Sequence, residues 1–177
     1  MRSRILALYC ACMATWATTL AAQRPLSLGI GGGVSVPEGR LNDGVNAGWH
    51  ALGTLALTSP MQPIGLRLDL AYNRFAFDEA PVDGHTSASS ATLNFTYRLP
   101  AAGAPLSPYL ISGLGAYRTQ CSDGPGCDSD THYGWNVGLG TVFHFLGVRT
   151  FLEARYHRTK QHDVRVRYIP VTLGLLI

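Results

Sequence analysis

Apolar and polar residues alternate with a period of two along most of the chain, a pattern typical of β-strands with one apolar and one polar face. In the clearest stretch, residues 64–77, the apolar face carries Ile64, Leu66, Leu68, Leu70 and Tyr72. The opposite face carries Gly65, Arg67, Asp69, Ala71 and Asn73. A soluble core would bury Arg67 and Asp69 at a cost of several kcal/mol each, unless they were paired. A narrow barrel with an apolar exterior accommodates both faces, because charges on neighbouring strands can pair inside it.

The alternation recurs along the chain and predicts eight strands of roughly ten to fourteen residues, the number and length found in the smallest membrane barrels. The expected strands are 26–36, 45–58, 64–77, 91–99, 109–118, 133–145, 148–157 and 168–177. No stretch after residue 22 has the period and caps of a long helix, and none is a candidate transmembrane helix. The predicted fold class is therefore all-β: an eight-stranded antiparallel up-and-down transmembrane β-barrel.

A soluble β-sandwich is the alternative, and in it the aromatic residues would form the core. In a membrane barrel they would form girdles at the two membrane interfaces. The predicted girdle residues are Trp49, Tyr72, Tyr97, Tyr109, Trp135, Phe145 and Tyr156. Strand 109–118 contains Gly113 and Gly115 and fits either register. We expect its outward residues to be Tyr109, Ile111 and Tyr117.

The connections between the expected strands alternate in character. Segments 37–44, 78–86, 120–131 and 159–165 are polar or charged and longer, whereas 59–63, 100–108 and 146–147 carry no charge. Membrane barrels have short periplasmic turns and longer extracellular loops. The asymmetry therefore predicts that both ends of the barrel chain lie in the periplasm and that the polar loops face the exterior.

The N-terminal segment has the features of a secretory signal peptide. Arg2 and Arg4 precede an apolar run from Ile5 to about Met13, and small residues surround Ala22. We expect residues 1–22 to be a cleaved signal peptide and residues 23–177 to form the barrel. A transmembrane anchor is the alternative, but threonines interrupt a run already shorter than the roughly 20 residues that a span requires.

Removing this segment changes the charge of the chain. The full sequence has 14 basic and 11 acidic residues, a net charge of +3. Arg2 and Arg4 are the only charged residues before Gln23, so 14 − 2 = 12 basic residues remain against 11 acidic ones, a net charge of +1. The mature chain therefore has no basic excess that would indicate nucleic-acid binding. The charged fraction of the full sequence, 14%, is well below the roughly 25% of soluble domains, as expected for a membrane barrel.

The last expected strand has one aliphatic face, made of Ile169, Val171, Leu173, Leu175 and Ile177. We expect this strand to close the barrel by pairing with the first strand, because an exposed aliphatic edge would promote aggregation. It also carries the predicted barrel-assembly signal, made of Tyr168, Leu173, Leu175 and Ile177.

Four segments carry a family resemblance: the Gly-rich strand 26–36, Pro108–Tyr117, Phe151–His157 and Tyr168–Gly174. Over nearly the whole mature chain they resemble the outer-membrane β-barrel domain family, which includes OmpX-like and OmpA-barrel-like proteins. The resemblance implies a location in the outer membrane of a Gram-negative envelope. The implied partners are outer-membrane lipid, lipopolysaccharide and the barrel-assembly machinery, and we expect a monomer without a cofactor. Proteins of this kind usually end in Phe, whereas this chain ends in Ile177.

Cys121 and Cys127 flank a turn rich in Gly and Pro within the third polar loop. In an oxidising compartment two such cysteines predict a disulfide, with a metal site or free thiols as alternatives. Asp123, Asp128 and Asp130 lie nearby but lack the ligand spacing of a known calcium loop, so no metal site is expected.

The predicted inward face carries five charged residues: Arg67, Asp69, Arg98, Glu153 and Arg155. We expect them to form a salt-bridge network in a lumen too narrow to conduct, because eight strands leave room only for side chains. The alternative is a small charge-lined pore or a ligand carrier.

One segment invites an enzymatic interpretation. His157-Arg158-Thr159 is similar to the His-x-Ser of the small-barrel lipid A 3-O-deacylases, which use a Ser/His/Glu arrangement. Thr159 stands in the place of the serine and no glutamate follows it, so the triad is incomplete. The sequence therefore favours a barrel without catalytic residues and with a structural, adhesive or envelope-stabilising role.

Overall fold

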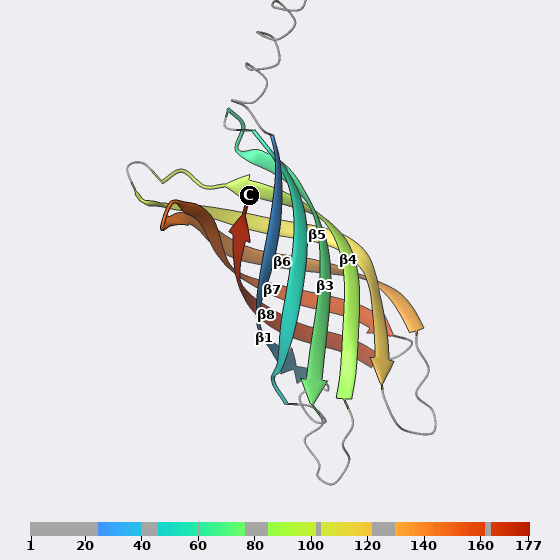
Figure 1. Cartoon of the computed structure of the whole chain (residues 1–177). Helices are drawn as coiled ribbons and strands as arrows, with labels where there is room; N and C mark the ends of the chain where they lie inside the picture. The colour runs from blue at the N-terminus through green and yellow to red at the C-terminus, as the bar shows by residue number, and fades with distance from the viewer. Residues whose placement is uncertain are drawn as a thin grey trace, which may run out of the picture.

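The structure is a computed structural model and describes residues 25–39, 46–59, 61–76, 85–101, 104–121, 130–161 and 164–177. These residues form a closed barrel of eight antiparallel strands in sequence order (Figure 1), which confirms the predicted fold class. The strands are β1 (Leu26–Glu38), β2 (Gly48–Thr58), β3 (Ile64–Ala76), β4 (His85–Arg98), β5 (Leu106–Cys121), β6 (Asp130–Phe145), β7 (Val148–Gln161) and β8 (Val164–Leu176). Among the described residues, no helix is long and apolar enough to cross a membrane.

The first and last strands close the barrel. Strand β1 pairs with β2 on one side and with β8 on the other, so that Gly33 lies between His50 and Thr172. The backbones of Leu28 and Ile177 exchange two hydrogen bonds of 2.9 and 2.7 Å, which extends the seam to the last residue. A closed sheet has no free edge, so its backbone groups are satisfied by neighbouring strands.

The two ends of the barrel differ (Figure 1). At the turn end, which is the upper end in Figure 1, strands are joined by 59–63, 99–105 and 146–147, and β1 begins and β8 ends there. The connections at the opposite end, the loop end, are 39–47, 77–84, 122–129 and 162–163. Leu146 and Gly147 both have positive φ, 50° and 80°, as a two-residue hairpin turn of the primed type requires.

The last loop is shorter than the sequence predicted. Strand β7 reaches Gln161 and β8 begins at Val164, so most of the expected loop 159–165 is strand. Thr159 pairs with Val166, is 4% exposed and continues the inward face of β7. Val166 packs against the lumen cluster that contains Tyr117. Paired, partly buried β-branched residues favour a strand over a loop.

The barrel is apolar outside and polar inside. On the outer face Ile30, Leu114 and Leu139 are 66%, 71% and 64% exposed. On the inner face Asn94 and Glu153 are 0% and 1% exposed. This is the inverse of a soluble protein, and it is stable where the outer wall meets an apolar medium.

The register of β5 is opposite to the expected one. Three residues expected outside face the lumen instead: Tyr109, Ile111 and Tyr117, which are 7%, 1% and 2% exposed. Leu110 and Leu114 take the outer face. Gly113 lies opposite Asn94 on the inner face, where a Cβ would collide with the Asn94 side chain. The absence of a side chain at Gly113 therefore makes room for the buried Asn94 side chain. Because Tyr109 faces the lumen, it is not part of the predicted girdle.

Candidate functional site

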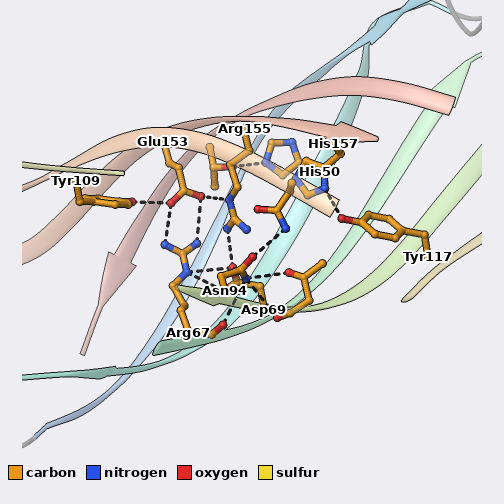
Figure 2. Close-up of polar contacts among 12 residues, drawn as sticks. His50, Arg67, Asp69, Asn94, Tyr109, Tyr117, Glu153, Arg155 and His157 are labelled. Atoms are coloured by element: carbon orange, nitrogen blue, oxygen red, sulfur yellow. Dashed lines mark hydrogen bonds and ion pairs between the residues drawn. The ribbon is translucent and has the colours of Figure 1, made fainter. Parts of the chain in front are cut away.

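Four charged side chains form a closed ring across the lumen (Figure 2). Arg67 donates from Nη1 and Nη2 to the two carboxylate oxygens of Glu153, at 2.8 and 3.1 Å, and from Nε to Asp69 Oδ1 at 2.8 Å. Arg155 completes the ring, with Nη2 2.7 Å from Asp69 Oδ2 and with Nε bonded to Glu153 Oε1. Two positive and two negative charges make this charge ring electrically neutral.

The topology explains why these four residues meet. Arg67 and Asp69 are two residues apart on β3, and Glu153 and Arg155 are two residues apart on β7. A spacing of two puts both members of each pair on the inward face. Strands β3 and β7 are four strands apart in a closed barrel of eight, so these two inward faces oppose each other across the lumen.

Neutral side chains add hydrogen bonds to both carboxylates of the charge ring. Tyr109 donates its hydroxyl hydrogen to Glu153 Oε2 at 2.7 Å, and Asn94 Nδ2 donates to Asp69 Oδ2 at 2.9 Å. The Arg67 guanidinium lies 5.2 Å from the centre of the Phe151 ring, a cation–π arrangement. The Glu153 side chain is 0% exposed, a degree of burial that a carboxylate tolerates only with such partners.

Arg98, the fifth predicted member, is not part of the charge ring. It faces inward from β4 but lies at the turn end, where it is exposed. Its Nη2 donates a long hydrogen bond of 3.5 Å to the backbone oxygen of Ser59. The sequence pattern identified the face that Arg98 occupies, but its height along the barrel keeps it from the carboxylates.

A second polar cluster, which we did not predict, surrounds His50. Ser35 Oγ donates to Asn73 Oδ1 at 2.7 Å and lies 3.1 Å from His50 Nδ1, and His50 Nε2 lies 2.8 Å from Thr172 Oγ1. All four residues occupy inward positions of their strands. The period-two alternation was therefore the sequence signal that could have identified them. The serine and histidine are adjacent, and Ser35 is 0% exposed.

Closer to the loop end, aromatic side chains fill the lumen. His157 Nδ1 lies 3.0 Å from the Tyr117 hydroxyl, and the imidazole stacks on Tyr168 with ring centres 5.0 Å apart. Phe75 packs edge-on against Tyr168 at 5.9 Å. His157 and Thr159 therefore point into a packed lumen and are 5% and 4% exposed.

The charge ring and the aromatic side chains leave little free space inside the middle of the barrel. A cavity of about 20 Å³ lies among His50, Asp69 and Arg155, roughly the room that one water molecule needs. A larger cavity of about 210 Å³ opens at the turn end and is lined by Arg67 and Tyr109 where it meets the ring.

The sequence model of the outer membrane protein β-barrel domain matches residues 5–175. The chain belongs to this outer-membrane β-barrel family. Its structure is similar to that of Neisserial surface protein A, with 16% identity and a TM-score of 0.67 over 88% of this chain and 97% of that chain. It is also similar to Ail, the attachment invasion locus protein of Yersinia pestis, with 20% identity and a TM-score of 0.55 over 86% of this chain and 97% of that chain.

A third similar structure is the N-terminal β-barrel domain of Pseudomonas aeruginosa OprF, with 15% identity and a TM-score of 0.52 over 88% of this chain and 99% of that chain. At these identities the structural similarity shows the fold alone. No curated protein matches the chain by sequence. Family membership confirms the predicted resemblance and the location of this barrel in the outer membrane.

The outer wall of this family member agrees with that location. Two outward ring pairs lie near the loop end, Trp49 with Tyr72 and Trp135 with Tyr156, each with ring centres 5.7 Å apart. Aromatic pairs of this kind are typical of the girdle at a membrane interface.

The remaining predicted features lie partly or wholly outside the described residues. Residues 1–22 and Cys127 are outside them, and Cys121 is described only as the last residue of β5, so the signal peptide and the disulfide stay predictions. In the predicted assembly signal, Tyr168 faces the lumen at 1% exposure, whereas Leu173, Leu175 and Ile177 are 56%, 42% and 84% exposed.

Proposed function

We propose that the protein is a non-conducting, non-enzymatic barrel with a structural, envelope-stabilising role in the outer membrane. The charge ring is the observation that carries this proposal. A pore needs a wetted path whose groups bind ions weakly enough to release them. In this lumen the charged groups of Arg67, Asp69, Glu153 and Arg155 are bonded to one another.

Planar-bilayer conductance of the refolded protein tests this role. The unmodified barrel is expected to pass no stable current. The triple variant Arg67→Ser, Glu153→Ser, Tyr168→Ser is expected to conduct, because it removes two large side chains of the charge ring and one of the aromatic cluster, while Asp69 and Arg155 still neutralise each other. Arg98→Ser is the matched control and should stay closed. Stable currents in the unmodified protein that Arg67→Ala abolishes would instead establish a small pore.

We place the loop end at the cell exterior. Three of its connections, 39–47, 77–84 and 122–129, are longer than any at the turn end, as in other membrane barrels. Any adhesive contact is assigned to these loops, which lie largely outside the described residues. A peptide tag within 122–129 should be labelled by antibody on intact cells, and labelling that needs permeabilised cells would reverse the orientation.

We also infer lipopolysaccharide as the lipid partner, at the loop end of β7 and β8. Arg158 and Arg167 are direct partners in the register, and Lys160 and Arg165 are register partners two positions further along. Like charges directly opposite on a sheet are destabilising. Glu38 of β1 is the other register partner of Arg167, whereas Arg158 has none that is negatively charged. The phosphates of an outer-leaflet lipid would supply further negative charge through charge-assisted hydrogen bonds.

A further inference from the structure

The cavity of about 210 Å³ at the turn end, which we call the vestibule, is a pocket with a closed bottom. Arg67 and Tyr109 line it where it meets the charge ring. Arg67 is held there by both carboxylate oxygens of Glu153, and the Tyr109 hydroxyl is held by the same carboxylate. The vestibule therefore ends at the charge ring and does not continue into a path through the barrel.

The charge of the vestibule is one-sided. Besides Arg67, its lining contains Arg98, His144 and Arg149, and no Asp or Glu is among the described residues that line it. Arg67 is already neutralised by the carboxylates of Asp69 and Glu153 in the charge ring. Arg98 and Arg149 are thus two cations in one pocket with no carboxylate partner among the described residues.

The two guanidinium groups approach the same wall from different sides. Arg149 reaches from β7 past β8 to β1, where its Nη1 lies 3.3 Å from Ser27 Oγ. Arg98 reaches from β4 past β3 to the end of β2, where it bonds the backbone oxygen of Ser59. Strands β1 and β2 are neighbours, joined at this height by a hydrogen bond of 2.7 Å from Thr58 N to the Pro25 oxygen.

Both arginines keep donors for a further ligand. A guanidinium has five N–H donors, and each of these two uses one of its nitrogens on a single neutral oxygen of the wall. Convergent, solvent-accessible guanidinium groups bind phosphate and carboxylate oxygens through charge-assisted, often paired, hydrogen bonds. The volume of the vestibule is below the roughly 300–1,000 Å³ of pockets for drug-sized ligands, which favours a small ligand.

We propose that the vestibule is a binding site for a small phosphate- or carboxylate-bearing anion, held between Arg98 and Arg149. The ligand enters from the compartment at the turn end and stops at Arg67 and Tyr109. This site goes beyond the structural role proposed above and does not depend on it, because binding requires the vestibule alone and no path through the lumen.

Calorimetric titration with inorganic phosphate tests the site, using the full barrel refolded in a neutral detergent without phospholipid. We expect saturable binding, with shifts in the backbone amide NMR signals of Ser107 and Val142, which line the vestibule. Arg98→Gln with Arg149→Gln should weaken binding at least tenfold, or about 1.4 kcal/mol. Arg118→Gln, an outward substitution at the loop end, is the matched control and should change nothing.

Heat-modifiable gel mobility confirms that each variant is folded, so a lost signal cannot reflect a lost barrel. The absence of saturable phosphate binding to the unmodified protein would overturn the site. Equal binding by the double variant would also overturn it. A third arm replaces free phosphate with vesicles of phosphatidylglycerol. If the two arginines contribute only there, they bind lipid headgroups at the membrane surface and the vestibule is not an anion site.

Discussion

Arg67 and Glu153 face each other across the lumen and share two hydrogen bonds, although 86 positions separate them along the chain. Each also bonds one further member of the charge ring, Arg67 with Asp69 and Glu153 with Arg155. Neutralising one of these residues would leave a net charge in a buried site.

Glu153→Gln is expected to lower the free energy of unfolding by about 3–5 kcal/mol, because Arg67 and Arg155 would then share the single carboxylate of Asp69. Urea unfolding in lipid vesicles measures this loss. The double variant Arg67→Met, Glu153→Gln should lose less free energy of unfolding than Glu153→Gln alone, because the remaining Asp69 and Arg155 leave the ring with no net charge. Arg98→Gln, outside the ring, should stay within about 0.5 kcal/mol of the unmodified protein. Equal losses in all three variants would contradict the ring as a coupled unit.

Gly113→Ala is expected to destabilise the barrel by about 1–3 kcal/mol, because the added methyl group would collide with Asn94 and with the backbone of β4. Gly53→Ala is the control, since its nearest neighbouring atom would lie 4.0 Å from the new Cβ. The control should be neutral or more stable by about 0.4–1 kcal/mol. Thermal unfolding in one detergent compares the two variants, and a similar loss in both would mean that Asn94 does not need this glycine.

Arg158→Gln should have effects of opposite sign in two lipid environments. In neutral detergent it removes a like charge opposite Arg167, which keeps Glu38 as its other register partner, and should raise stability by about 0.2–1 kcal/mol. With lipopolysaccharide present it should lower stability, because a phosphate contact is lost. Arg118→Gln, whose register partners are the uncharged Ser89 and Thr131, should not show the first effect. A gain in both environments would contradict lipopolysaccharide binding at this pair.

Ile177→Phe is expected to preserve or improve insertion into the outer membrane. Ile177 is 84% exposed and is held by backbone hydrogen bonds to Leu28, so a larger apolar side chain can be accommodated outside the wall. Fractionation and heat-modifiable mobility in cells measure the folded fraction. Poorer insertion than in the unmodified protein would show that the assembly signal of this chain is recognised differently.

Much of the fold was predictable because one face of nearly every strand is chemically distinct from the other. The alternation of Leu66 and Leu68 with Arg67 and Asp69 identified both the strand and its inward face. The same rule identified Glu153 and Arg155 as inward residues, and four of the five predicted lumen charges do meet. Period-two alternation is a local property of each strand, so it can be recognised in the sequence without knowing which strands are neighbours.

The failures arose where the answer depends on residues of other strands. In β5 both faces are apolar, so residues on other strands decide which face points inward. Asn94 on β4 needs the small Gly113 beside it, and Glu153 on β7 accepts a hydrogen bond from the Tyr109 hydroxyl. For Arg98, alternation gave the face but not the height in the barrel. The His50 cluster combines side chains from β8, β1, β2 and β3, and no single stretch of sequence shows that they converge.

The order of the charges along the two strands of the ring has a consequence for assembly. Strands β3 and β7 run in the same direction, and Arg then Asp on β3 meets Glu then Arg on β7. If β7 slipped by two residues in one direction, Arg67 would meet Arg155. If it slipped by two residues in the other direction, Asp69 would meet Glu153. Such a slip keeps every side chain on its proper face, so patterning alone cannot prevent it. The buried charges therefore favour one alignment of β7 relative to β3, and with it one register of the whole barrel. They act across the lumen, which the hydrogen bonds between adjacent strands do not span.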